Sequence, residues 1–206
     1  SLALRQARQP AGDLAIARAE HNLARWLLRE GQPEAARPLA DAAAAVRRKA
    51  LSRDHAEHVG SALQQVEVML ALGELPQAAA ALTPWQSAVP KWRRPQQLQW
   101  HRLQGRLALA QGRAAEAVAH YAQAEALAAS VWPARHPARA RLAVEQANAE
   151  VLAGLRADAA RRLAAAGPVL AALPARGPTQ QAARALRQRL GTAAALANPS
   201  RTNSAS

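Results

Sequence analysis

The sequence lacks residues on which several classes of protein depend. It has no cysteine, which excludes disulfides and thiolate metal sites. It has no phenylalanine and only 3% aromatic residues, whereas sheet proteins need aromatic and β-branched side chains. No run of about 18 apolar residues occurs, so we expect no membrane insertion by this chain. Half of its 206 residues are nevertheless apolar, mostly alanine, and this composition predicts an all-α protein.

Motifs that carry common enzyme chemistry are also missing. There is no glycine-rich phosphate loop, no Gly-x-Ser-x-Gly elbow and no His-Glu-x-x-His motif. Only the segment Asp54-His55-Ala56-Glu57-His58 combines metal-ligand residue types, and its spacing fixes no third zinc ligand beside His55 and His58. We interpret it as a solvated helix start with acids near the positive end of the helix dipole. We therefore expect no catalytic residue, metal or cofactor, and keep a metal-dependent enzyme at the two histidines as an alternative.

Basic residues outnumber acidic ones by 27 to 14, which gives a formal net charge of +13. All of them except Lys49 and Lys91 are arginine. Positive potential attracts anions, so the functional interpretation is an acidic partner. The alternative is a GC-rich genome, whose codons favour arginine and alanine together, and in that case the charge has no functional meaning.

A unit built around a glycine recurs four times. Gly31, Gly73, Gly112 and Gly154 are separated by 42, 39 and 42 residues, and an alanine follows each glycine five residues later. Glycine readily adopts the left-handed conformation of a helix C-cap, so each glycine predicts the end of one helix and the start of another. A period near 40 with one helix on each side predicts a solenoid of helical hairpins.

These turns divide the chain into helix pairs, which we predict at about residues 13–51, 54–89, 95–131 and 137–173. Second helices should start near Pro33, Pro76, Ala114 and Ala157. A closing helix at 178–190 should cover the last apolar face, so that residues 1–190 form one repeat domain. The polar segment 191–206 is predicted to be a disordered tail.

Proline and capping residues predict where the helices break. Pro10-Ala11-Gly12 should separate a preceding helix from the first pair, with Asp13 as the N-cap, and Asp54 should cap the third helix. Pro84 should shorten or kink the second helix of its pair, and Gly167-Pro168 should bend a later one.

Two segments near the first turn resemble the tetratricopeptide (TPR) family, in the long-repeat variant found in kinesin light chains and many bacterial proteins. They are His21-Asn-Leu-Ala24 and Gly31-Gln-Pro-Glu-Ala-Ala-Arg-Pro38-Leu39, and His136-Pro137 resembles the variant's His-Pro linker. The resemblance implies an α-solenoid (superhelix) of antiparallel helix pairs that acts as a non-catalytic protein–protein interaction scaffold. Because the chain begins with Ser1 rather than methionine, we expect it to be part of a longer protein. The resemblance implies that this is the C-terminal part of a larger bacterial regulatory protein, such as a serine/threonine kinase.

The resemblance also implies which side chains face the concave groove: those six, ten and thirteen residues before each turn glycine. The candidate groove residues are Arg18, His21, Arg25, Glu67, Arg102, Arg106, Arg141 and Asn148. The planar guanidinium suits carboxylates or phosphates, and an asparagine amide can orient a peptide backbone. We expect an acidic peptide or protein as partner. The alternative is that these are ordinary solvated arginines.

Two further patterns have competing interpretations. Gln65, Gln104 and Gln146 each lie eight residues before a glycine, either as amide donors beside a peptide or as buried groups bonded to a neighbouring repeat's backbone. Three tryptophans interleave with basic residues and could stack on single-stranded nucleic acid, or could fill gaps between repeats. These are Trp85, Trp92 and Trp100, with Lys91, Arg93, Arg94 and Arg102 between or beside them.

Overall fold

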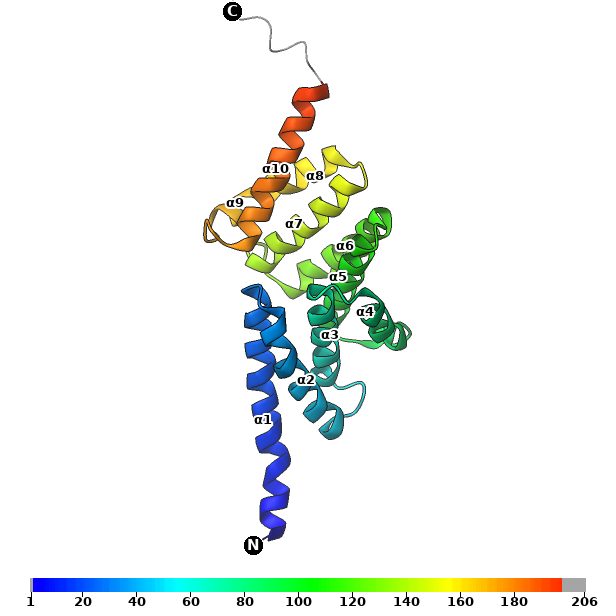
Figure 1. Ribbon diagram of the computed structural model, residues 1–206, viewed down its shortest axis with the longest axis vertical. Helices are drawn as coiled ribbons and strands as arrows, with labels where there is room; N and C mark the ends of the chain where they lie inside the picture. The colour runs from blue at the N-terminus through cyan, green and yellow to red at the C-terminus, as the bar shows by residue number, and fades with distance from the viewer. Residues whose placement is uncertain (1, 198–206) are drawn as a thin grey trace, which may run out of the picture. The chain divides into compact units, whose positions relative to one another are not determined.

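A computed structural model describes residues 2–197, which form helices joined by turns and contain no β-strand (Figure 1). The predicted all-α class is therefore confirmed. The chain divides into two compact units, residues 1–111 and 112–206. None of the described helices is both long and apolar enough to cross a lipid bilayer.

The first unit contains five α-helices. They are α1 (Leu2–Arg29), α2 (Pro33–Ala50), α3 (Ala56–Ala71), α4 (Leu75–Leu82) and α5 (Arg94–Ala110), with the 3₁₀ helices η1 (Thr83–Trp85) and η2 (Val89–Lys91) between the last two. Helix α1 packs on α2, α2 on α3, and α3 on both α4 and α5. This order is that of stacked helix pairs, as the sequence predicts.

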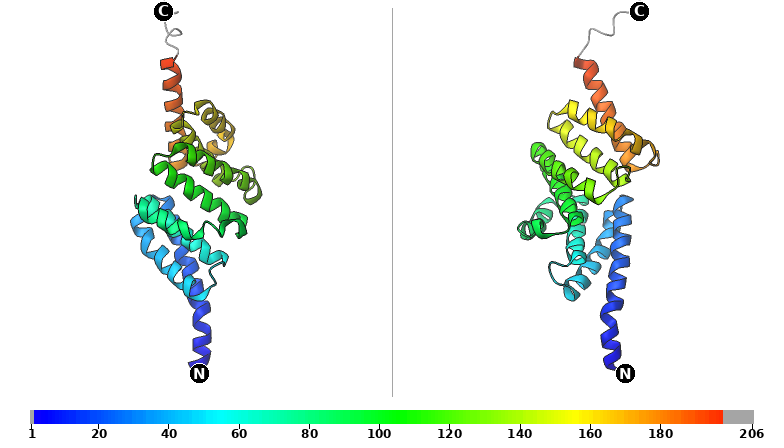
Figure 2. Two further views of the ribbon diagram at one scale, coloured as in Figure 1. Left: turned by 90° about the vertical axis from the view of Figure 1, so that its right-hand side faces the viewer. Right: turned by 180° about the vertical axis from the view of Figure 1, so that it is seen from behind.

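The second unit contains α6 (Ala114–Val131), α7 (Pro137–Leu152), α8 (Arg156–Ala165), α9 (Gly167–Ala171) and α10 (Pro178–Ala197). Helix α6 packs on α7 and α7 on α8, and α10 then lies against α7, α8 and α9 (Figure 2). In the core of this unit Ala183 and Leu186 of α10 contact Leu163 and Leu170. Helix α10 is therefore the predicted closing helix.

The four repeat glycines have φ angles of 73°, 77°, 76° and 82° in chain order, and no other described residue has a positive φ. Each turn ends one helix and opens the next, and the second helices start at Pro33, Leu75, Ala114 and Arg156. These starts agree with the predicted ones to within one residue. After the first turn the Gln32 N–H donates to the Leu27 carbonyl at 2.9 Å, the long-range bond of a Schellman cap.

Alanine supplies much of the contact between helices. In the first pair Ala24 on α1 meets Ala36 and Ala40 on α2, and Val68 of α3 joins the same cluster. A methyl side chain occupies little volume, so these helices approach closely. Several alanines in both units are completely buried: Ala17, Ala24, Ala36, Ala43, Ala78, Ala117, Ala124, Ala147, Ala149, Ala159 and Ala183.

Two predicted helix starts are wrong. Helix α1 runs without a break through Pro10 and Gly12, so Asp13 lies inside the helix rather than at its N-cap. A proline removes one backbone donor, and a helix can continue past it at that cost. Helix α3 is capped by His55 rather than Asp54: the Glu57 N–H donates to His55 Nδ1 at 3.2 Å.

Helix ends elsewhere follow the prolines as predicted. Helix α4 stops at Leu82, just before Thr83-Pro84, and a 3₁₀ turn continues the chain. Residues 156–171 bend between α8 and α9 at Gly167. Helix α10 continues seven residues past the predicted end at Leu190, because Gly191 is followed by alanines and leucine, which favour helix. Residues 198–206 of the predicted tail lie outside the described residues, and the single 1–190 domain stays a prediction.

A pair of glycine substitutions tests the role of the turn conformation. Gly73→Ala should lower the free energy of unfolding by about 1–2 kcal/mol, because φ is positive there and an L side chain is strained. No atom lies within 4 Å of the added Cβ, so the cost is conformational.

Gly60→Ala is the matched control, because Gly60 lies inside α3 and also has open space around its Cβ position. There alanine should stabilise the fold by about 0.5–1 kcal/mol. Urea denaturation measures both values, and equal effects of the two substitutions would contradict the assignment of Gly73 as a left-handed cap.

Candidate functional site

Three predicted groove residues lie on one side of α1. Arg18, His21 and Arg25 are spaced three and four residues apart, so they share a helix face. Arg18 is 67% exposed and its Nη2 lies 3.0 Å from Glu57 Oε1 on α3. Arg25 is exposed and donates from Nη2 to Asn22 Oδ1 on the same helix at 3.1 Å. Among the described residues no carboxylate pairs with Arg25.

A third cation, which the sequence analysis did not find, lies behind this face. Arg47 on α2 is buried and donates from Nη1 to Ser61 Oγ at 2.7 Å. Its Nε lies 3.6 Å from Glu57 Oε2, so Arg18 and Arg47 share one carboxylate. Burial lowers the pKa of Arg47 below its usual value, while Glu57 acts in the opposite direction.

His21 reports the electrostatics of this cluster. Burial is the main cause that lowers its pKa to about 4, and the positive charges of Arg47 and Arg25 act in the same direction, against the smaller opposing effects of Gln64 and Glu57. The imidazole is therefore neutral at pH 7, and the local potential is positive. His21 is half-buried at a register position that is core in two other first helices. Ten residues before Gly73 and Gly154 lie Leu63 and Val144, which are both buried, whereas before Gly112 the position is taken by the half-buried Arg102.

The other groove residues of this unit form a single ion-paired cluster between α3 and α5. Glu67 Oε1 lies 3.1 Å from Arg106 Nη1 and 3.2 Å from Arg102 Nη1, and Gln99 Nε2 donates to Glu67 Oε2 at 3.0 Å. All three charged side chains are largely shielded from solvent. Burial alone would raise the pKa of Glu67, but Arg102, Arg106 and the hydrogen bonds together hold it below its usual value.

The Glu67 cluster makes the predicted groove less positively charged than the sequence analysis expected. Arg102 and Arg106 were expected to present two positive charges to a ligand, whereas one carboxylate neutralises part of that charge. Opposite charges at the same register in neighbouring repeats are the sequence signal for such a pair: Glu67 and Arg106 both lie six residues before their turn glycine. Arg18 has Gly60 at its own register in α3. Arg25 has Glu67 there, but among the described residues Glu67 pairs with Arg102 and Arg106 and not with Arg25, so this register signal alone does not decide which pair forms.

In the second unit Arg141 and Asn148 both lie on α7, seven residues apart, and both are half-buried. The strongest polar contact of this unit was not predicted. Arg162 on α8 donates from Nη2 to Glu150 Oε1 at 2.8 Å and from Nη1 to Glu125 Oε2 at 3.1 Å. Glu150 is buried, so this arginine holds α6, α7 and α8 together.

Glutamines connect neighbouring repeats, as one interpretation proposed, but not at the predicted positions. Gln64 Nε2 donates to the His21 carbonyl at 2.8 Å and Gln96 Nε2 to the Ala56 carbonyl at 3.4 Å. Gln65 instead donates to Asp41 Oδ1 of α2 at 2.7 Å. Gln146 is buried and Gln104 half-buried, so neither extends freely into solvent.

The histidines considered as metal ligands have structural roles. His55 caps α3, and His136 caps α7 in the same way by accepting from the Ala138 N–H at 3.1 Å. His58 Nδ1 lies 3.1 Å from the Ser52 carbonyl, and its ring packs edge-on to Trp85. Within residues 2–197 no group of three or more histidine, cysteine or acidic side chains is arranged to hold a metal ion.

The tryptophans considered for nucleic-acid stacking are largely core residues. Trp92 is 8% and Trp100 6% exposed, and both belong to the cluster that contains Leu82 and Leu103. Trp85 packs against that cluster, and the Arg53 guanidinium lies 4.8 Å from its ring centroid. Buried rings cannot stack on nucleobases, so Trp92 and Trp100 fill the space left by the short helix α4.

Comparison with known proteins agrees with this fold. Residues 16–57 match the tetratricopeptide repeat family model. The nearly identical TPR-like repeats of a protein described as a kinesin light chain from Podosopora anserina superpose with a TM-score of 0.59 at 24% identity, over 89% of this chain and 97% of that one. A glutamine-to-methionine variant of the same protein gives a TM-score of 0.57, at 24% identity over 89% and 96% of the two chains. No curated protein matches the sequence. The predicted resemblance to kinesin-light-chain-like TPR repeats is confirmed.

Replacing Glu67 tests whether its ion pairs hold α3 to α5. Glu67→Gln should destabilise the protein by roughly 1.5–3 kcal/mol, because charge-assisted bonds to Arg102 and Arg106 are lost. Glu116→Gln is the control, since Glu116 pairs with Arg113 on the surface and should contribute less than about 1 kcal/mol. Chemical denaturation at pH 7 compares them, and an unchanged midpoint for Glu67→Gln would show that the cluster is energetically neutral.

Replacing Trp92 tests the packing role of the irregular segment. Trp92→Ala should cost about 3–5 kcal/mol of stability, because it removes a large buried side chain. Trp26→Ala should change stability by less than about 0.5 kcal/mol, because Trp26 is 53% exposed. Thermal melts give both values. Unchanged stability of Trp92→Ala combined with lost oligonucleotide binding would favour a nucleic-acid interface instead.

Proposed function

We propose that this chain is a non-catalytic protein–protein interaction scaffold that binds an acidic peptide or protein. The proposed binding surface centres on Arg18, His21 and Arg25 of α1, which we call the α1 basic face. The match of residues 16–57 to the TPR family and the TPR-like fold support the interaction role.

The observation that carries the choice of an acidic ligand is the local excess of positive charge. Arg18, Arg25 and Arg47 are three cations, and Glu57 is the one acid that pairs with any of them among the described residues. Arg47 and Arg25 lower the pKa of His21, which indicates that their positive charge acts at the position of the imidazole ring. A ligand carboxylate beside Arg25 would offset charge that the protein itself leaves uncompensated.

The remaining groove residues have supporting parts in this proposal. Arg102 and Arg106 are already positioned by Glu67 and are kept as contacts for the ligand. Arg141 and Asn148 are kept as contacts that the resemblance implies. The hypothesis of a bacterial regulatory parent, such as a serine/threonine kinase, also depends on the resemblance alone.

A binding experiment with matched arginine variants tests the proposal. The probe is the tightest binder from a library of 12-residue peptides that each contain at least three aspartates or glutamates. Arg25→Ala should weaken its binding about tenfold or more, because a charge-assisted bond contributes roughly 1.5–3 kcal/mol. Arg189→Ala is the control: Arg189 is an exposed arginine on α10, and its loss should change the dissociation constant less than about twofold.

The pKa of His21 provides a second, site-specific readout. When the acidic peptide binds, its carboxylates should raise this pKa above about 4, which NMR titration of the imidazole resonances measures. Equal losses from Arg25→Ala and Arg189→Ala, with a steep dependence on salt, would show a nonspecific basic surface. An unchanged His21 pKa in the saturated complex would place the ligand elsewhere.

A further inference from the structure

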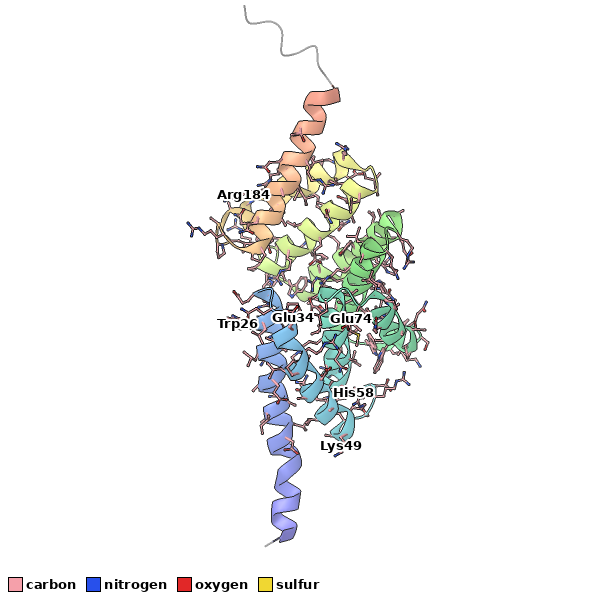
Figure 3. The ribbon with its side chains drawn as sticks, in the orientation of Figure 1. Trp26, Glu34, Lys49, His58, Glu74 and Arg184 are labelled. Atoms are coloured by element: carbon pink, nitrogen blue, oxygen red, sulfur yellow. The ribbon has the colours of Figure 1, made fainter. Side chains whose placement is uncertain are left out.

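A second surface of α1 has the opposite character. Ile16, Leu23 and Trp26 are 59%, 48% and 53% exposed, and together with exposed Ala19 they are spaced three, four and three residues apart. This spacing places all four on one side of the helix, which we call the α1 apolar stripe. Trp26 points away from α2 (Figure 3). Exposed apolar side chains grouped in this way mark interaction surfaces.

The internal repeats show what this side of a first helix normally contacts. Ala19, Leu23 and Trp26 lie twelve, eight and five residues before Gly31, and the equivalent residues of α3 are Ser61, Gln65 and Val68. All three contact α2, the second helix of the preceding pair. Ser61 accepts from Arg47, Gln65 donates to Asp41, and Val68 packs on Ala36 and Ala40.

The same register is covered in the other first helices. In α5 the equivalent residues include Trp100 and Leu107, which are buried in a cluster with Ala78 and Leu82 of α4. In α7, which packs on α6, the equivalents are Leu142, Gln146 and Ala149, and all three are buried. Among the described first helices, Gln65 and Gln104 are partly exposed at this register, but only α1 exposes large apolar side chains there, Leu23 and Trp26.

We propose that the α1 apolar stripe is the packing site for a further α-helix, which lies on α1 as α2 lies on α3. The occupant has small apolar residues along one side, because alanines fill this role on α2 against Val68. This surface is separate from the α1 basic face, so the inference does not depend on the proposed function.

Charge distinguishes the occupant further. Asp13 and Glu20 lie three or four residues from Ile16 and Leu23, and Arg29 and Glu30 lie three and four residues from Trp26. Acids therefore outnumber arginine three to one along the borders of the stripe. Where α2 covers α3, the covering helix supplies the arginines: Arg47 pairs with Glu57 of α3, and Arg37 pairs with Glu74 in the turn after α3. A second copy of α1 would bring the same acids together, and like charges repel. The complementary occupant is therefore an alanine-rich helix with arginine or lysine beside its small residues.

The test uses the whole chain labelled with 5-fluorotryptophan and a synthetic peptide of residues 32–50, which has the required alanines and arginines. Fluorine NMR resolves each tryptophan, and Trp26→Phe assigns the signal of interest. The peptide should shift the Trp26 signal saturably, because binding removes this ring from water. Exchange of the peptide with native α2 would not produce that shift, since Trp26 faces away from α2.

Leu23→Arg should weaken binding at least tenfold while leaving the melting temperature unchanged, because Leu23 is half exposed. The matched control is Leu155→Arg, an exposed leucine in the second unit, which should leave the affinity unchanged. A peptide with glutamate in place of Arg37, Arg47 and Arg48 should bind at least tenfold more weakly.

Three results would overturn the proposal. The first is no shift of the Trp26 signal at saturating peptide. The second is equal affinity for the arginine peptide and its glutamate counterpart. The third is a concentration-dependent Trp26 shift without peptide, accompanied by a dimer in light scattering, because the occupant would then be a second copy of this chain.

Discussion

Contact between alanine-lined helix faces is the constraint on which both units depend. Ala24 against Ala36 and Ala40 lets α1 and α2 approach closely, and a longer side chain at any of these positions would overfill the contact. Alanine also has a cost: a methyl group buries little apolar area, so each contact stabilises the fold only slightly. Larger buried side chains, such as Trp92 and Trp100 beside the short helix α4, supply apolar area that alanine does not.

The polar contacts follow from this close packing. Helices that approach through alanine leave room only at their edges, and arginine is long enough to reach across from there. Glu57, Glu67 and Glu150 each accept from arginine on a neighbouring helix, and the first two take a pair of arginines each. In an arginine-rich chain the few acids thus fix inter-helix geometry, and Arg25 is among the cations that remain without an acid among the described residues.

Local sequence signals predicted the order of the helices, but they did not predict which side chains on different helices pair with one another. Four glycines with a period near 40 located every turn, because left-handed φ is a property of the residue itself. The Glu67 cluster depends on which side of α3 meets α5, and a single-residue shift of register would have separated Glu67 from Arg102. His21 shows the same limit. The family resemblance predicted that this side chain faces the groove, whereas packing against its neighbours leaves it half-buried. The continuous α1 was missed because Pro10 weakens a helix by one bond without ending it.

Helix α1 separates its interactions onto three sides. Ala17 and Ala24 are buried towards α2, Arg18 and Arg25 form the basic face, and Leu23 and Trp26 form the apolar stripe. The acids Asp13 and Glu20 border the stripe and lie away from Arg25, so the two exposed sides favour ligands of opposite charge. The two proposed ligands, an acidic peptide and a basic helix, therefore involve different side chains of one helix. This separation makes Arg25 and Leu23 independent probes, since replacing either leaves the other surface intact.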